Sequence, residues 1–331
     1  MRNDASPAAP PAVSILMPTF NRLEFVPPAI ESVLAQSFAD WELIIADDGS
    51  GSDTTEYLQS LRHPRIKVLC MAHTGMPPVM LNAALRAAHG EFIAFLDSDD
   101  VWLPRKLELQ VASLRRRPDR RWSCTAFALI DAAGHPLAAA TRTGWPAVSG
   151  WVRDRLFTDG VIAMPSVMAA RSLFDQVGEF DESLAMNYDG DLWLRFAELS
   201  ELDGIDEPLT LVRRHGLHGG SDIIAWSDLR RVIEKAQCSA GDADFLAMLR
   251  EQRAVTAAGL ARSHALFGRR RDAVRTLAES APYSWSYPRW WRVGAYASAR
   301  VLAPKFVFGG LRALRAHMRA LRSGTPERRQ N

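Results

Sequence analysis

Three carboxylates follow directly on an apolar run in the stretch "EFIAFLDSDDVW". Residues 92–96 are apolar, and Asp97, Asp99 and Asp100 come immediately after them. Like charges persist this close together only when water, a cation or hydrogen-bond donors hold them. Because magnesium takes oxygen ligands, usually one or two carboxylates together with substrate phosphates, Asp97 and Asp99 predict a divalent-cation site that faces a diphosphate. The alternative is an Asp-rich turn in which Asp100 caps the helix that starts near Pro104.

Two further acidic stretches could take part in the same chemistry. "DDGS", Asp47 to Ser50, could hydrogen-bond a base or a ribose, or it could form only a loop and a helix cap. In "NYDGDLWLR", residues 187–195, Asp189 comes just before an expected helix, and a helix start favours an ionised carboxylate. An ionised carboxylate that faces an acceptor hydroxyl is a candidate general base. An ordinary helix cap is the alternative at this position as well.

A basic, glycine-rich segment follows the last expected strand of the first two thirds of the chain. "RRHGLHGGS", residues 213–221, contains Arg213, Arg214, His215 and His218. These side chains could meet a diphosphate, or a histidine could complete a metal shell. A glycine-rich surface loop without a ligand is the alternative.

The elements that would position these residues follow from apolar runs and helical spacing. Strands alternate with helices four times over about 100 residues, which is typical of a parallel α/β sheet with helices on both faces. Ligands of such sheets bind beyond the carboxyl ends of the strands. Four polar clusters, "PTFN", "DDGS", "HTG" and "DSDD", fall at those ends. The expected strands are residues 13–17, 41–46, 66–70 and 92–96, and the expected helices are 24–37, 52–61, 79–88 and 104–116.

The pattern changes after residue 122. We expect a strand and turn in "WSCTAFALI" and "DAAGHP", a helix over 149–157, and a strand in "PSVMAAR". A short helix that Gly178 ends, a helix over 190–200 and a strand in "EPLTLVRRH" complete this half. From about residue 223 onward the chain is rich in Ala and Arg and is expected to be helical.

Composition narrows the class of protein. Hydrophobic residues make up 47% and charged residues 24% of the 331 residues, and the net charge of +2 argues against a chain built to coat nucleic acid. Cys70, Cys124 and Cys238 have no metal-ligand spacing, and we expect Cys70 and Cys124 to be buried thiols in a reducing, cytoplasmic compartment. Residues 1–12 lack a signal-peptide core and predict a flexible leader. No apolar run reaches the length of about 18 residues that a spanning helix needs.

Several of these stretches, in this order, resemble the family 2 glycosyltransferases, which are inverting enzymes with the GT-A fold. The matching stretches are "VSILMPTFNR", "SVLAQSFADWELIIADDGS", "GEFIAFLDSDDVWLPRKLE", "GEFDESL" and "YDGDLWLR", and they span residues 13–221. The fold class that this implies is α/β, a mixed Rossmann-like GT-A sheet flanked by helices. The resemblance divides residues 13–222 into a nucleotide-sugar-binding half, 13–121, and an acceptor-side half, 122–222. Residues 223–331 form a helical, basic C-terminal extension.

The resemblance also implies a role for each matching residue. Asp97, Asp99 and His215 would hold Mg²⁺ or Mn²⁺ on the donor diphosphate, and Asp189 would be the catalytic base. The residues that would contact the nucleotide-sugar are Pro18, Phe20, Asn21, Asp47, Asp48, Asn82, Asp97, Ser98 and His215. Two positions depart from the family pattern, because Tyr188 stands where an acidic residue is usual and Leu81 stands where an arginine is common.

The reaction that the resemblance implies moves a sugar from a nucleotide-diphospho-sugar, expected to be a UDP-sugar, to an acceptor hydroxyl. The acceptor would be a glycan or a lipid-linked glycan in the synthesis of a bacterial surface polysaccharide or lipopolysaccharide. Two other functions fit parts of the sequence. A nucleotide-sugar-binding partner without turnover would explain Tyr188 and Leu81. A haloacid-dehalogenase-like phosphatase would use Asp97 as its nucleophile, although three strand–helix units precede the motif here.

The segment 283–331 has a basic amphipathic pattern. Tryptophans and arginines alternate in its first part, and apolar residues recur at helical spacing between arginines in its second part. This pattern suits an anionic membrane surface and predicts a peripheral location at the inner face of the plasma membrane. The alternatives are packing on the catalytic body and packing on a second subunit in a homodimer.

Overall fold

The computed structural model describes residues 9–137, 149–158, 162–214 and 221–302. The chain forms two compact units, residues 1–217 and 218–331, and each is described by itself. Most of the expected leader, His215 and His218 of the glycine-rich segment, and residues 303–331 of the basic tail lie outside the described residues.

The first unit contains a mixed sheet whose described strands run in the order β3-β2-β1-β4-β7-β6-β8-β5. The strands β1 to β4 are parallel to one another. Among the later strands, β7 is antiparallel to β4, and β8 is parallel to β6. The bounds are β1 Val13–Thr19, β2 Trp41–Asp47, β3 Ile66–Cys70, β4 Phe92–Phe95, β5 Val101–Trp102, β6 Trp122–Ile130, β7 Val167–Ala170 and β8 Leu202–Arg213. The predicted parallel strands and the mixed GT-A sheet are confirmed.

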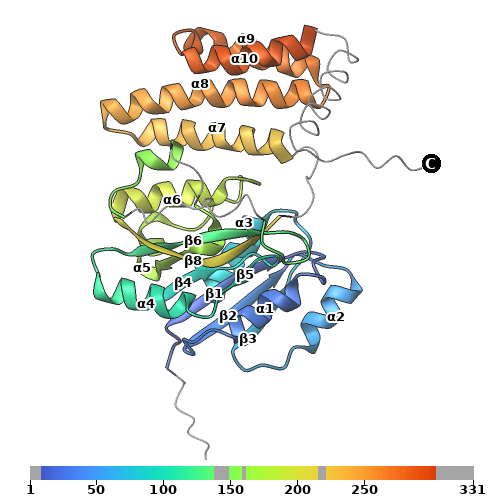
Figure 1. Ribbon diagram of the computed structural model, residues 1–331, viewed down its shortest axis with the longest axis vertical. Coiled ribbons are helices and arrows are strands. Elements are labelled where there is room, and N and C mark those ends of the chain that lie inside the picture. Colours follow the sequence, from blue (N-terminus) through green and yellow to red (C-terminus); the bar gives the residue numbers. More distant parts are fainter. Residues whose placement is uncertain (1–8, 138–148, 159–161, 215–220, 303–331) are drawn as a thin grey trace, which may run out of the picture. The chain divides into compact units, whose positions relative to one another are not determined.

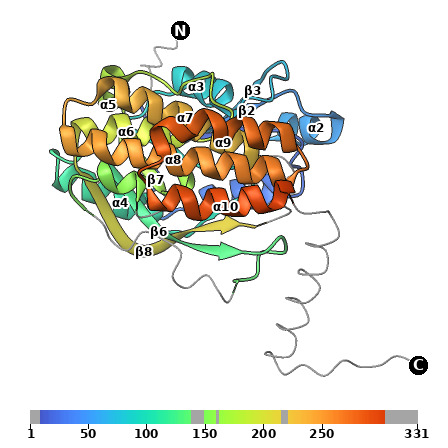
Figure 2. The same ribbon diagram turned by 90° about the horizontal axis from the view of Figure 1, so that it is seen from above.

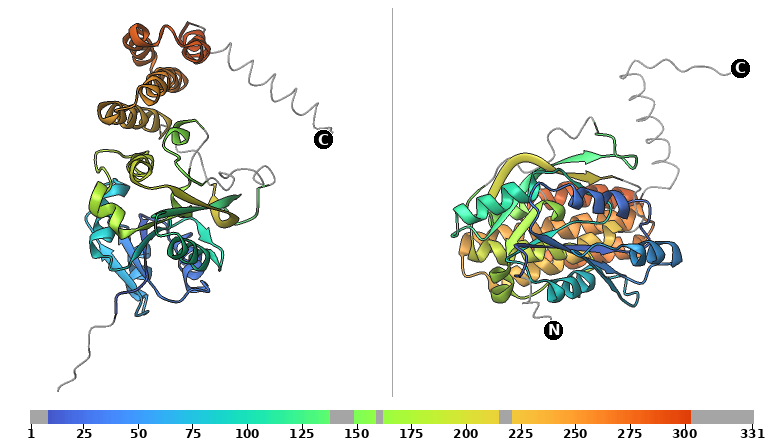
Figure 3. Two further views of the ribbon diagram at one scale, coloured as in Figure 1. Left: turned by 90° about the vertical axis from the view of Figure 1, so that its left-hand side faces the viewer. Right: turned by 90° about the horizontal axis from the view of Figure 1, so that it is seen from below.

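Helices cover both faces of this sheet, because its central strands are apolar on both sides (Figures 1 and 3). One core cluster joins the sheet to α1 (Val26–Leu34), α2 (Ser52–Ser60) and α4 (Lys106–Arg116). The other joins it to α3 (Pro77–Ala87), α5 (Arg171–Val177) and α6 (Tyr188–Leu199). The two helical layers fix the strand ends, where the polar clusters lie.

A buried polar network lies between α4 and the sheet. Lys106 is fully buried, its Nζ donates a hydrogen bond of 2.6 Å to Gln110 Oε1, and it lies 4.1 Å from the centre of the Trp102 ring. Gln110 Nε2 donates in turn to the carbonyl of Ser166 at 3.0 Å. Because burial disfavours the charged form, the pKa of Lys106 lies well below its ordinary value.

The second unit consists of helices in its described part. These are α7 (Ser221–Ser239), α8 (Ala243–Leu266), α9 (Arg270–Ser284) and α10 (Pro288–Leu302). The helices α8, α9 and α10 run side by side (Figure 2), and α8 also packs on α7. Gly259 of α8 allows the close contact between α8 and α7, because a Cβ atom at this position would lie 2.8 Å from the ring of Trp226 in α7. No described helix of the chain has both the length and the apolar character that crossing a membrane requires.

Three local expectations differ from the structure. Residues 149–157 form only a 3₁₀ turn over Asp154–Phe157 in place of a helix. Cys124 is buried as predicted, but Cys70 is exposed, because β3 is the edge strand of the sheet. The helix α4 begins at Lys106 without a side-chain cap, so Asp100 does not cap it.

Candidate functional site

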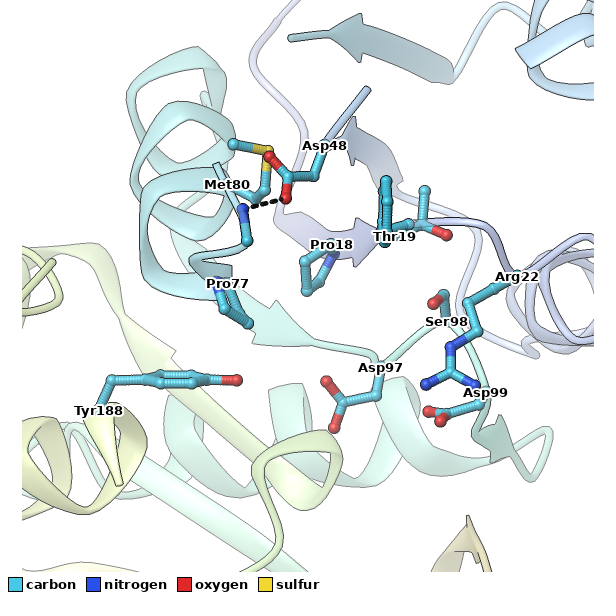
Figure 4. A pocket seen from close by; sticks show the side chains of 12 residues that line it. Pro18, Thr19, Arg22, Asp48, Pro77, Met80, Asp97, Ser98, Asp99 and Tyr188 are labelled. Carbon is cyan, nitrogen blue, oxygen red and sulfur yellow. Dashed lines mark hydrogen bonds between the residues drawn. The ribbon is translucent and has the colours of Figure 1, made fainter. Parts of the chain in front are cut away.

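A pocket of about 280 Å³ lies at the carboxyl ends of β1, β2 and β4. It brings together six of the residues predicted from the sequence, and Figure 4 shows most of them facing one space. These six are Pro18, Phe20, Asp48, Asp97, Ser98 and Asp99. The remaining lining residues are Thr19, Arg22, Gly75, Pro77, Met80 and Tyr188.

Hydrogen bonds of Asp100 and Arg213 hold the turn that carries Asp97 and Asp99. The backbone N–H of Asp100 donates to the Asp97 carbonyl at 3.0 Å, and the buried Asp100 side chain accepts a 2.7 Å hydrogen bond from the backbone N–H of Arg213. Arg213 Nε also donates to the Asp99 carbonyl at 2.8 Å. Further bonds tie its guanidinium to the carbonyls of the turn after β6, so Arg213 holds the motif in place and does not line the pocket.

The electrostatics of this turn are unfavourable for more negative charge. Burial, then the neighbouring carboxylates of Asp99 and Asp189, raise the pKa of Asp97 to about 8. Asp97 and Asp99 are both half-buried, so solvent screens their repulsion only in part. Among the described residues, no group of three or more His, Cys, Asp or Glu side chains could hold a metal ion. The pair is nevertheless the donor set that magnesium or manganese uses when a diphosphate supplies the other ligands.

The start of α6 lies opposite this turn. Asn187 adopts a left-handed conformation with φ 54°, and the helix then begins at Tyr188, so Asp189 lies inside the first turn. The backbone N–H of Gly190 donates to Asp189 Oδ1 at 2.8 Å. Burial outweighs these backbone contacts and raises the pKa of Asp189, whereas the sequence predicted that the helix start would favour its ionised form. Asp189 is close enough to raise the pKa of Asp97, but it is not among the lining residues of the pocket.

Tyr188 lines the pocket, and Figure 4 shows its hydroxyl directed toward the Asp97 carboxylate. Burial, followed by the charges of Asp97, Asp189 and Asp99, raises the pKa of Tyr188 well above its ordinary value. The phenol therefore stays protonated and can donate a hydrogen bond. The departure from the family pattern at this position replaces a carboxylate by a neutral donor.

The loop after β3 closes the other end of the pocket. The Asp48 carboxylate accepts hydrogen bonds from the backbone N–H groups of Thr74, at 2.7 Å, and Gly75, at 2.8 Å. The ring of His73 stacks on that of Phe20 with centroids 4.1 Å apart, and Phe20 remains 39% exposed. The "HTG" cluster thus reaches the site as the strand-end argument predicted, and Asp48 shapes its loop.

Three predicted ligand residues do not line the pocket. Asp47 accepts hydrogen bonds from the backbone N–H and the hydroxyl of Ser50. Asn21 donates from its backbone to Ser50 Oγ and accepts from the Gly51 N–H, which joins the loops after β1 and β2. Asn82 Oδ1 accepts from the backbone N–H of Phe180, and its Nδ2 donates to the Phe180 carbonyl and to the Glu182 carboxylate.

Thr19 and Arg22 line the pocket although the sequence did not single them out. The buried hydroxyl of Thr19 has no hydrogen-bond partner within the described residues. Arg22 and Asp99 both line the pocket (Figure 4), so the guanidinium supplies a cation to the same space as the carboxylates. The sequence could have indicated both residues, because they belong to the polar segment that directly follows the first predicted strand.

Comparisons with known proteins agree with this geometry. The family model "Glycosyl transferase family 2" matches residues 14–125. An uncharacterized glycosyltransferase of Rickettsia felis is 34% identical over 206 residues, which is 62% of this chain and 33% of the relative. The E. coli protein WfgD, a UDP-Glc:alpha-D-GlcNAc-diphosphoundecaprenol beta-1,3-glucosyltransferase, is 41% identical over 102 residues, 31% of this chain and 40% of the relative. The chain thus spans well under two thirds of the length of these relatives.

Solved structures show the same fold at low identity. S. aureus TarS 1-349 in complex with UDP-GlcNAc has a TM-score of 0.61 and 16% identity, with 96% of this chain and 93% of that chain covered. Mannosyltransferase PcManGT from Pyrobaculum calidifontis, in complex with GDP-Man and Mn²⁺, has a TM-score of 0.58 and 17% identity, with 89% and 87% covered. The fold contradicts the phosphatase alternative, because Asp97 follows the fourth strand of a GT-A sheet. Residues 14–125 of this chain thus match the glycosyltransferase family 2 model, and the first unit has the GT-A fold.

Proposed function

We propose that this chain is an inverting glycosyltransferase that moves a sugar from a nucleotide-diphospho-sugar to an acceptor hydroxyl. The observation that carries the proposal is the pocket at the ends of β1, β2 and β4, where Asp97 and Asp99 face Tyr188. Its lining combines oxygen ligands, a cation in Arg22 and the exposed ring of Phe20. These are the groups that a diphosphate and a base need.

Asp97 and Asp99 would hold a magnesium or manganese ion together with the donor diphosphate. Their hard oxygen atoms suit either ion, and the repulsion between them favours a cation at this place. When bound, such an ion would offset the negative charge that develops on the leaving diphosphate. The structural neighbour PcManGT was solved with Mn²⁺, which supports this part of the proposal. His215, the third predicted ligand, lies outside the described residues.

Asp189 would act as the general base. Its raised pKa suits a carboxylate that accepts a proton near neutral pH. As the acceptor hydroxyl loses its proton to Asp189, its oxygen bonds to the anomeric carbon, and the bond from that carbon to the diphosphate breaks. Attack on the face opposite the leaving group inverts the anomeric configuration.

The donor would be a UDP-sugar, and the acceptor a glycan or lipid-linked glycan of a bacterial surface polysaccharide, lipopolysaccharide included. Two similar proteins support this class: WfgD acts with UDP-Glc on a diphosphoundecaprenol-linked sugar, and TarS was solved with UDP-GlcNAc. A screen of nucleotide sugars and acceptor glycans would identify both the donor sugar and the acceptor.

A binding and turnover experiment tests the proposal. We expect nucleoside diphosphates and nucleotide sugars to raise the melting temperature of the full chain only when Mg²⁺ or Mn²⁺ is present. Asp189→Asn should lower transfer by about 10²- to 10⁴-fold, because the proton acceptor is lost, and should leave donor binding intact. The matched control is Asp206→Asn, which changes an exposed carboxylate of β8. Donor binding without any transfer or hydrolysis by the wild type would favour the binding partner without turnover.

The described part of the segment 283–331 supports contact with a membrane from the cytoplasmic side. Trp285 and Trp291 are 67% and 43% exposed, and their rings contact each other with centroids 4.6 Å apart. Arg289 and Arg292 are exposed on the same short stretch, which has no acidic residue. Indole rings with nearby cations favour the interface of an anionic bilayer.

Sedimentation with anionic liposomes tests this contact. The wild type should sediment with the liposomes at low salt and less at high salt. Trp285→Ala together with Trp291→Ala should reduce the bound fraction several-fold, whereas Phe267→Ala, at an exposed aromatic position of the same unit, should not. An unchanged bound fraction, or loss of a dimer in the double variant, would favour packing on a second subunit.

A further inference from the structure

A second cavity, of about 330 Å³, lies within the second unit and has no part in the function proposed above. Three helices and the residue just before α10 supply its walls. The lining residues are Gln237 of α7, Leu246, Arg250 and Arg253 of α8, Tyr283 of α9 and Tyr287.

Positive charge dominates this cavity. Arg253 lies 3.3 Å from the Glu234 carboxylate, and that carboxylate is also shared with Arg230 at 3.9 Å. Arg250 is exposed and forms no ion pair with the described residues. The Glu234 carboxylate thus pairs with two guanidinium groups, and Arg250 adds a third guanidinium at the wall of the cavity, so an anion in the cavity would be attracted.

One hydrogen-bond donor of a residue that lines the cavity has no acceptor among the described residues. Arg253 Nε is buried and has no hydrogen-bond partner in the described part of the chain. The Arg253 guanidinium lies 4.4 Å from the centre of the Tyr283 ring, which holds it against one wall. A buried donor without a partner costs free energy, and a ligand oxygen would remove that cost.

The other walls suit a saccharide. Tyr283 and Tyr287 are half-buried, so each offers an aromatic surface and a hydroxyl. Burial raises the pKa of Tyr283, which keeps its hydroxyl a donor at neutral pH. Gln237 adds an amide that can both donate and accept. The cavity volume of about 330 Å³ is roughly ten times the volume of about 30 Å³ that one molecule occupies in liquid water, so the cavity has room for a ligand with several polar groups.

We propose that this cavity binds a sugar phosphate. The Arg250 and Arg253 guanidinium groups take the phosphate, since planar guanidinium groups bind phosphate oxygens in pairs. The Tyr283 and Tyr287 rings and the Gln237 amide take the sugar. The inference stands apart from the transfer reaction and requires no activity of the first unit.

Saturation-transfer difference NMR on the full chain tests the proposal with glucose 1-phosphate, neutral glucose and inorganic phosphate as probes. We expect glucose 1-phosphate to bind more tightly than either of the others, because only it engages both walls. Arg250→Ala should weaken its binding at least tenfold, the effect of losing a charge-assisted hydrogen bond. Arg250 is exposed, so this variant should fold, and Arg250→Lys should retain part of the affinity.

Two control variants locate the binding. Arg275→Ala removes an exposed arginine of α9 that pairs with Asp272 at 2.8 Å, and it should leave the affinity unchanged. Asp97→Asn in the first unit should also leave it unchanged. Equal binding of neutral glucose, equal binding of inorganic phosphate, an unaffected Arg250→Ala variant, or loss of binding in Asp97→Asn would each overturn the proposal.

Discussion

The pocket of the first unit is lined by Asp48, Asp97 and Asp99 beside one arginine, whereas the cavity of the second unit is lined by Arg250 and Arg253. No carboxylate is among the described lining residues of the second cavity. In the proposed function, the first pocket would need a cation before it could hold a diphosphate. The second supplies its own cations. Under the two proposals, one chain would hold phosphate groups in two ways, one that depends on a metal ion and one that does not.

Removal of a carboxylate from the first pocket should have the largest effect. Asp97→Asn replaces a charged oxygen ligand by a neutral amide, and we expect transfer to fall at least about a thousandfold, because stabilisation of the leaving diphosphate is lost. Steady-state transfer assays at saturating Mn²⁺ measure the change. The control is Asp206→Asn, on an exposed position of β8. If Asp97→Asn transfers sugar at the wild-type rate, even with a chelator present, the first pocket needs no metal ion.

The difference between the two cavities is also a difference in how far the sequence predicts them. Asp97 and Asp99 were predictable because a buried strand ends directly before them, and the ends of parallel strands meet at one edge of the sheet. Arg250 and Tyr283 come from separate helices and belong to no short motif. Only the packing of α8 on α7 and α9 brings them together, and a single sequence does not specify that packing.

The same reasoning explains why some predicted ligand residues do not line the first pocket and why Cys70 is exposed. Asn82 follows the pattern of a donor-site residue, but its amide bonds to Phe180, which lies far along the chain. Cys70 sits in an apolar run, but its strand lies at the edge of the sheet, and strand order is not visible in local periodicity. Local patterns predicted the strands and their polar ends; the contacts between distant segments decided which polar groups remain free to bind a ligand.

The helix packing that builds the second cavity can be broken at one glycine. Gly259→Ala places a Cβ atom 2.8 Å from the Trp226 ring, so α7 and α8 must separate. We expect a loss of about 1–3 kcal/mol in the unfolding free energy, measured by urea denaturation, together with weaker binding of glucose 1-phosphate. Gly241→Ala is the control, since nothing lies within 4 Å of its added Cβ atom. Equal stability of the two variants would contradict the close contact.

Lys106 gives the first unit a dependence of stability on pH. Its pKa is lowered by burial in the folded chain, so between that pKa and its ordinary value near 10.5 the unfolded chain binds more protons. The unfolding free energy should therefore rise with pH in this window, by up to about 1.4 kcal/mol per pH unit. Lys106→Met should remove this rise in urea denaturation between pH 7 and 9. The exposed control Lys67→Met should keep it, and parallel pH profiles for Lys106→Met and the wild type would show that Lys106 does not titrate in this way.

The smallest effect should come from the hydroxyl of Tyr188, and it sharpens the contrast between a metal-dependent and a metal-independent site. Tyr188→Phe keeps the ring that contacts Phe180 and removes only the donor that faces Asp97. A neutral hydrogen bond contributes about 0.5–1.5 kcal/mol, so transfer should fall by about two- to tenfold. Because the phenol hydroxyl is directed toward a carboxylate that would hold the cation, the variant should also change the Mn²⁺ concentration that gives half-maximal transfer. Titration of Mn²⁺ with both proteins measures this change, and identical curves would mean that Tyr188 acts on the acceptor side and not through Asp97.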